Sequence, residues 1–308
     1  MRFLWGNVTF TLLFSGAMFL FSPPFLQADE KPTVLATTTL IADLVRSAAG
    51  DFVQVEALMG PGVDPHVYKA TQGDLSKLGR ADIVFFHGLH LEGKMTEIFS
   101  KLGKRKNFFA VGESLSRDVL MAPPEFEGNY DPHVWFDVRL WQSCFSFVSD
   151  RLIEMLPAED AGSIRAKSEA YEQELSKLHS WVGEQIQSIP APKRVLITAH
   201  DAFGYFGRAY GIEVRGLQGI STSSEFGLRD VKNLADFVIE RRIPSVFVES
   251  SVPKKFIEAL QSGVRERGFD LTIGGELFSD ALGVPGGVGA TYVEMIHHNV
   301  STIVDALQ

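Results

Sequence analysis

The sequence predicts an α/β protein of two lobes, each a small parallel sheet flanked by helices, joined by one long linking helix. Short apolar runs of strand length alternate with helical patterns before residue 157 and again after residue 194. This alternation is typical of open parallel sheets covered by helices. Between the two stretches, residues 158–188 contain no proline and repeat apolar residues at spacings of three and four, which predicts a single long helix.

The first half is predicted to contain four buried strands, because each run is short, apolar and bounded by turn or helix signals. These strands are expected at residues 34–37, 53–58, 83–86 and 108–111. Helices are expected at residues 40–49, from about 74 onward, at 92–102 and from 134 to about 156. Thr39 is a capping residue for the first helix, and Thr71 with Asp74 gives a start signal for the second. Residues 112–132 form a long irregular segment, and such a loop inside a compact domain is usually functional.

The second half repeats this architecture after Pro190, which ends the long helix. Strands are expected at residues 195–199, 212–214, 245–248 and 271–273. Helices are expected at residues 202–210, 226–240 and 253–267, and from Thr291 to the C-terminal end. Pro253 suits the first turn of its helix. With 308 residues the chain is long enough for two domains with separate cores.

The N-terminal segment predicts secretion. Arg2 precedes an apolar stretch at residues 8–21, and Ala28 stands before the charged residues that follow, so residues 1–28 fit a cleaved signal peptide. Cleavage leaves an N-terminal lobe at 29–157, the linking helix at 158–189 and a C-terminal lobe at 190–308. The only cysteine, Cys144, lies within a helical pattern, which predicts a buried thiol. No cysteine stands at the predicted cleavage boundary, so we expect a form without a lipid anchor. Secretion by the signal peptide predicts a periplasmic location.

Charge restricts the class of partner. The formal net charge is −9 and the isoelectric point is about 5.4, with no basic patch. This balance argues against nucleic acids and anionic membrane surfaces and suits a cationic ligand.

Four side chains predict a metal site. The tetrapeptide Asp-Pro-His-Val occurs at residues 64–67 and again at 131–134, and each proline places its histidine, His66 or His133, in a loop or at a helix start. His200 closes the apolar run before it, and Asp280 precedes a glycine-rich segment. Ligands of parallel sheets bind beyond the carboxyl ends of the strands. Three imidazoles and one carboxylate make a complete ligand set for an ion such as Zn2+.

Other residues compete for these roles. His87 and His90 also follow a strand and are alternative ligands, though a role next to the ligands fits them better. Glu249 closes residues 246–248 and is expected to accept a hydrogen bond from a ligand imidazole, with direct ligation as the alternative. Glu249 is also the obvious general base for a different class of protein, a secreted zinc-dependent hydrolase. The sequence lacks the His-Glu-x-x-His, Gly-x-Ser-x-Gly and Cys-x-x-Cys motifs.

The chain resembles the solute-binding proteins of ABC transporters for zinc, manganese and iron. The resemblance covers essentially the whole mature chain and is carried by residues 64–68, 131–137, 198–206 and 277–280. It implies two α/β lobes, one linking helix, and one divalent ion held between the lobes at His66, His133, His200 and Asp280. It also implies delivery of the ion to a membrane permease driven by a separate ATPase. We expect a monomer that is not an enzyme.

The identity of the metal stays open between Zn2+ and Mn2+. Intrinsic affinity for three imidazoles and one carboxylate favours zinc, and members of the family dedicated to manganese tend to carry glutamate where this chain has His200. Zinc members often have a histidine-rich loop before the second ligand, but residues 112–132 contain no histidine. We therefore expect zinc or manganese, with iron less favoured.

Overall fold

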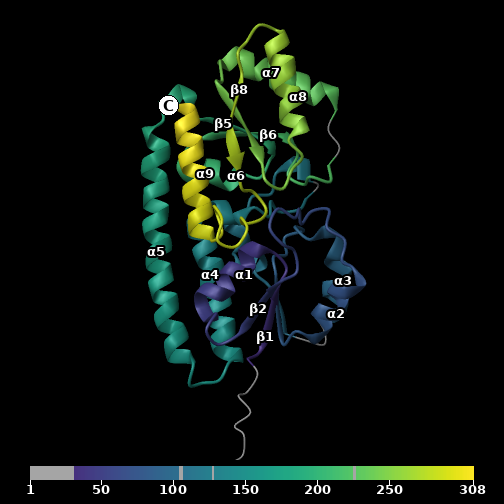
Figure 1. The fold of residues 1–308 in the computed structure, drawn as a ribbon, viewed down its shortest axis with the longest axis vertical. Coiled ribbons are helices and arrows are strands. Elements are labelled where there is room, and N and C mark those ends of the chain that lie inside the picture. The colour runs from purple at the N-terminus through teal and green to yellow at the C-terminus, as the bar shows by residue number, and fades with distance from the viewer. Residues whose placement is uncertain (1–30, 104–106, 127, 225–226) are drawn as a thin grey trace, which may run out of the picture. The chain divides into compact units, whose positions relative to one another are not determined.

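The computed structural model describes residues 31–103, 107–126, 128–224 and 227–308. It confirms the α/β class, with parallel strands flanked by helices and one long helix, as Figure 1 shows. The predicted signal peptide, residues 1–28, lies outside the described residues. Within the ranges described, no helix combines the length and the apolar character that a membrane crossing requires.

The first half contains a four-stranded parallel sheet in the order β2-β1-β3-β4. The strands are β1 (Thr33–Ala36), β2 (Gln54–Ala57), β3 (Ile83–Phe86) and β4 (Asn107–Ala110). The helices are α1 (Thr39–Ala49), α2 (Gln72–Arg80), α3 (Thr96–Leu102) and α4 (Val138–Met155). The predicted irregular segment 112–132 holds only short 3-10 turns among its described residues.

Several helix starts differ from the prediction. Helix α2 has the predicted capping box of Thr71 and Asp74, but α1 is capped by Thr38, whose side chain accepts from the Ile41 amide. The Thr39 hydroxyl instead accepts from the Leu282 amide at 2.8 Å, which connects the start of α1 to the second half of the chain. Helices α3 and α4 begin later than expected because a 3-10 turn precedes each of them. The prediction that Pro253 lies in the first turn of its helix is wrong, because this helix begins at Lys255 with Lys254 as its N-cap.

The second half contains two parallel strand pairs, β5-β6 and β7-β8. The strands are β5 (Val195–His200), β6 (Glu213–Gln218), β7 (Ser245–Glu249) and β8 (Thr272–Leu277). The helices are α6 (Gly204–Tyr210), α7 (Leu228–Arg241), α8 (Lys255–Glu266) and α9 (Tyr292–Leu307). Strands β5 and β7 lie next to each other, and at their carboxyl ends the His200 amide donates to the Glu249 side chain.

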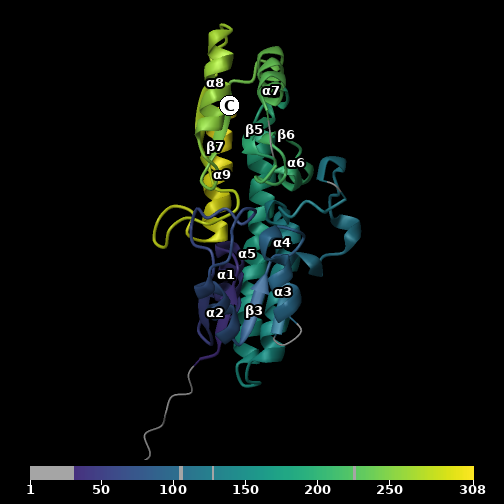
Figure 2. The same cartoon turned by 90° about the vertical axis from the view of Figure 1, so that its right-hand side faces the viewer.

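The long helix is α5 (Ala161–Ser188). It packs against α1 and α4 of the first half and against α6 and α9 of the second, and Figures 1 and 2 show it running alongside both sets of helices. Its buried stripe is Ile164, Ser168, Leu175, Leu178, Val182 and Ile186. This spacing is the amphipathic pattern that predicted the helix.

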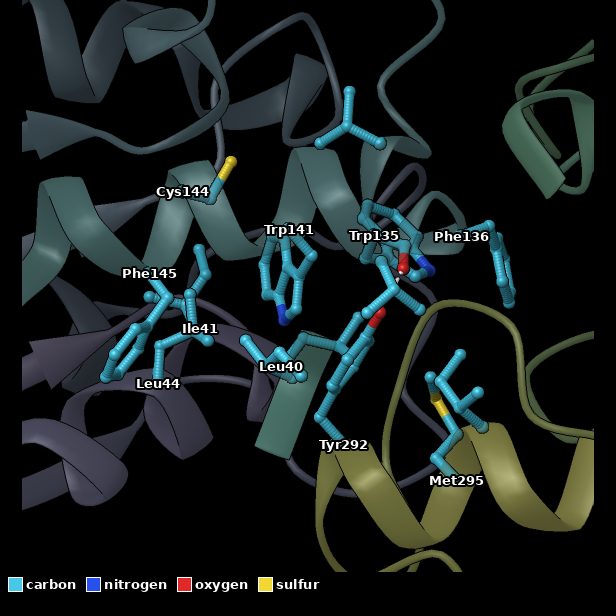
Figure 3. Close-up of a cluster of buried hydrophobic side chains, with 14 of the residues drawn as sticks. Leu40, Ile41, Leu44, Trp135, Phe136, Trp141, Cys144, Phe145, Tyr292 and Met295 are labelled. Carbon is cyan, nitrogen blue, oxygen red and sulfur yellow. Dashed lines mark hydrogen bonds between the residues drawn. The ribbon is translucent and has the colours of Figure 1, made fainter. Parts of the chain in front are cut away.

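We expected a separate core in each half of the chain, but the largest core cluster spans both halves. The largest cluster of buried apolar side chains includes Trp141 from α4 and Phe247 from β7. The reason is the C-terminal helix, which returns along α5 and places Tyr292 beside Trp135 and Trp141 (Figure 3). Smaller clusters lie under α2 and α3 and under α7 and α8. A continuous core resists independent motion of the halves, because separating them would expose apolar surface.

Candidate metal centre

The four predicted ligands converge. His66 follows β2, His133 ends the irregular segment, His200 is the last residue of β5, and Asp280 follows β8. The His133 Nε2 atom lies 3.3 Å from the Nε2 atoms of both His66 and His200. Asp280 Oδ1 lies 3.5 Å from Nε2 of His133 and of His200. Each of the four residues offers one ligand atom, and these four atoms all lie within 4.8 Å of one another.

These separations are those of a small coordination shell. Four atoms placed tetrahedrally at about 2.0–2.1 Å from a centre, the usual bond length for zinc and histidine nitrogen, lie about 3.3–3.4 Å apart. The side chains are sequestered: His66 is 3% exposed, and His133, His200 and Asp280 are 0% exposed. Asp280 Oδ1 is buried and has no hydrogen-bond partner among the described residues, so it is a free acceptor facing the ring nitrogens of His133 and His200. A buried carboxylate oxygen in this position fits a cation.

The repeated tetrapeptide builds the same local structure twice. In the first copy, Asp64 Oδ1 accepts from the His66 amide at 2.9 Å. In the second, Asp131 Oδ1 accepts from the His133 amide, also at 2.9 Å. Each aspartate therefore fixes the backbone of the histidine two residues later, a role typical of this residue in turns. We missed this role in the sequence, although the recurrence of aspartate in both copies was the available signal.

Carboxylates also orient two of the rings. Asp131 Oδ1 lies 2.8 Å from His133 Nδ1, and Glu249 Oε2 lies 2.6 Å from His200 Nδ1. A partner on Nδ1 leaves Nε2 to face the centre, as in many metal sites. Glu249 therefore lies beside a ligand imidazole, and its Oε1 atom accepts from the His200 amide at 2.8 Å; that it also accepts from the ring stays a prediction. Ser251 donates to the second oxygen of Asp280 at 3.1 Å.

Comparison with known proteins identifies the family of the chain. The family described as "ZnuA: Zinc-uptake complex component A periplasmic" matches residues 34–306. The chain belongs to this family. The match confirms the resemblance to the solute-binding proteins of metal ABC transporters.

Two relatives in this family share almost half of the aligned residues. The "Zinc-binding protein TroA" of Treponema pallidum is 49% identical over 280 residues, covering 91% of this chain and 90% of that protein. The "Manganese-binding lipoprotein MntA" of Bacillus subtilis is 46% identical over 282 residues, covering 91% of each. The solved structure of the periplasmic zinc-binding protein TroA from Treponema pallidum superposes with a TM-score of 0.87 over 90% of this chain and 99% of that one. The metals in these two names, zinc and manganese, are the two between which the sequence did not decide.

Protonation of the centre in this zinc-uptake family member is set by burial and by neighbouring charges. Burial lowers the pKa of His66 well below its ordinary value. Burial acts in the same direction on His133, but the adjacent carboxylates of Asp131 and Asp280 outweigh it and raise its pKa to about 9. Burial also lowers the pKa of His200, but the carboxylates of Glu249 and Asp280 outweigh it and raise this pKa well above the ordinary value. An ion entering at neutral pH must therefore displace protons from His133 and His200.

The two competing histidines lie outside the group of four. His87 is 1% exposed, and its Nε2 lies 2.7 Å from the Pro132 carbonyl oxygen, so it contacts the backbone beside a ligand. His90 is exposed, has a left-handed backbone with φ of 67°, and lines a separate cavity of about 680 Å³ with Phe99 and Arg117. Neither belongs to the group of potential ligands found among the described residues.

Proposed function

We propose that the protein captures one divalent transition-metal ion at His66, His133, His200 and Asp280 and delivers it to an ABC permease for import. The observation that carries the proposal is the spacing of the four buried ligand atoms. Nε2 of His133 lies 3.3 Å from Nε2 of His66 and of His200, and Oδ1 of Asp280 lies 3.5 Å from Nε2 of His133 and of His200. A site that uses four protein ligands suits capture, whereas a catalytic zinc keeps a position open for water. The hydrolase alternative also loses its general base, because Glu249 contacts the ring nitrogen of His200 that faces away from the centre.

The first test is binding by the metal-free protein. Titration of chelator-treated protein with Zn2+ is expected to give one ion per chain. At free metal about 100 times the dissociation constant, the free energy of unfolding should rise by about 2.7 kcal/mol if only the native state binds. Thermal unfolding with Zn2+ and with Mn2+ measures this. Unfolding curves unchanged by either ion at saturation would contradict the proposal.

Zinc is the cargo that the donor set favours. Three imidazole nitrogens and one carboxylate oxygen suit Zn2+, whereas Mn2+ prefers more ligands and more oxygen. The names of the two relatives, one zinc-binding and one manganese-binding, leave manganese as the competitor. Competition between the two ions for the metal-free protein decides this, and a higher affinity for Mn2+ would overturn the preference.

We also propose that the mature protein is periplasmic, monomeric and without a lipid anchor. The only cysteine in the sequence, Cys144, is fully buried in α4, whereas several relatives are named lipoproteins. Mass spectrometry of the secreted chain should give an N-terminus at Asp29, and an acylated or uncleaved chain would contradict this.

The lobes at residues 29–157 and 190–308, joined by a helix at 158–189, are proposed to move little on binding. Helix α5 packs against helices of both halves, and a continuous helix resists a wide hinge. Continuous protection of α5 amides from hydrogen exchange would support a rigid connector, and fast exchange in its middle would contradict it.

A further inference from the structure

Two buried rings hold the backbone beside two of the metal ligands. The Trp135 indole donates to the Ser279 carbonyl oxygen at 3.0 Å, and this carbonyl belongs to the peptide that ends at the amide of Asp280. The His87 ring lies 2.7 Å from the Pro132 carbonyl oxygen, which belongs to the peptide that ends at the amide of His133. Both bonds therefore act on the peptide unit immediately before a ligand.

The state of His87 is well defined. Burial lowers the pKa of its imidazole to about 3, so the ring is neutral, and a carbonyl oxygen can only accept. Nε2 of His87 therefore carries the proton and donates to Pro132. The Glu92 carboxylate accepts from the amides of His87 and Gly88 at 2.7 and 3.1 Å, which fixes the backbone from which the ring projects.

The two rings form one buried unit. His87 packs edge-on against Trp135, with ring centroids 5.1 Å apart, and both residues are at most 1% exposed. The Trp135 carbonyl accepts from the Tyr292 hydroxyl at 2.7 Å, and Figure 3 shows Tyr292 reaching from α9 toward Trp135. Trp135 lies two residues after His133, so its indole connects the segment that carries His133 to the peptide that carries Asp280.

We propose that Trp135 and His87 are positioning residues that set the separation of His133 and Asp280 and so favour a small tetrahedral ion over a larger one. This inference rests on the proposed function. A binding site needs its ligands held to within about 0.5 Å by the groups behind them. Zn2+ gains most from a fixed tetrahedral spacing, whereas Mn2+ accepts more ligands. Loosening these two peptides therefore costs Zn2+ more affinity than it costs Mn2+.

The chain supplies a matched control for the tryptophan. Trp135→Phe removes the indole N–H that donates to Ser279. Trp141→Phe removes the same atoms from the same cluster, but the Trp141 N–H has no hydrogen-bond partner among the described residues. Both residues are fully buried, their ring centroids lie 6.4 Å apart, and both pack against His87, while Trp135 also packs against the ring of His133. General loss of packing affects both variants, whereas loss of ligand positioning affects only the first.

Equilibrium titration of metal-free protein with Zn2+ and with Mn2+ tests the proposal. We expect Trp135→Phe to weaken Zn2+ binding by about 10–100-fold, the usual effect of losing an outer hydrogen bond at a metal site, with a smaller loss for Mn2+. Trp141→Phe should keep both affinities within about threefold. His87→Leu should resemble Trp135→Phe, and His87→Gln, whose amide can donate from nearly the same place, should recover most of the Zn2+ affinity.

Thermal unfolding of each metal-free variant confirms that it is folded before titration. Equal Zn2+ affinities and equal Zn2+ to Mn2+ ratios for Trp135→Phe and Trp141→Phe would overturn the positioning role while leaving the proposed function intact. Failure of the unsubstituted protein to bind either ion would overturn the proposed function itself.

Discussion

Replacing His200 with alanine lowers the affinity for Zn2+ by at least about 100-fold, because the loss of one of four ligands exceeds the 10–100-fold effect of losing an outer contact. His200 is fully buried, and its Nε2 lies 3.5 Å from Asp280 Oδ1. The remaining three ligands would leave a position open to water. Titration of the metal-free variant with Zn2+ measures the loss.

The control for this experiment is His179→Ala on α5. His179 is half-buried, and its Nδ1 lies 3.0 Å from the Tyr210 hydroxyl, so the variant also removes a histidine with a hydrogen-bond partner. It should bind Zn2+ like the unsubstituted protein. Comparable losses of Zn2+ affinity in both variants would mean that the effect comes from altered folding. An unchanged Zn2+ affinity of the His200→Ala variant would show that His200 is not a ligand.

The second large effect is that of pH. Carboxylates beside His133 raise its pKa to about 9 despite burial, and the pKa of His200 is raised as well. Below such a pKa the metal must displace a proton, so affinity falls about tenfold per pH unit for each proton displaced. Affinity for Zn2+ should therefore fall by about 10–100-fold between pH 8 and pH 7. Ordinary imidazoles, with a pKa of about 6.5, would give little of this fall above pH 7.

Calorimetric titration in buffers of different ionisation enthalpy measures the protons released on binding. The account predicts a release of one to two protons at pH 7 that declines as the pH rises through 9. Binding that is independent of pH from 6 to 8, with no proton release, would show that His133 and His200 are not protonated in the metal-free protein.

The sequence carried the fold class and the four convergent residues because those features are local. An apolar run predicts a buried strand, and β5 is buried along its whole length up to His200. The Asp-Pro-His repeat presents two histidines from loops because proline interrupts regular structure. The helix over residues 158–188 follows from its apolar spacing, and the structure places α5 at Ala161–Ser188.

The remaining features depend on which segments become neighbours. Trp135 reaches Ser279 and His87 reaches Pro132 across long sequence separations, so no local pattern predicts either bond. The cap of α1 falls at Thr38 because Thr39 bonds the Leu282 amide instead. The continuous core has the same origin, since only the return of α9 brings Tyr292 against the first half.

Anomalous diffraction from crystals of the zinc-loaded protein, recorded above and below the zinc absorption edge, tests the central claim most directly. The account predicts one strong peak per chain, about 2.0–2.2 Å from Nε2 of His66, His133 and His200 and from Oδ1 of Asp280. A zinc peak located elsewhere, or one from which any of these four atoms stands too far to coordinate, would contradict it.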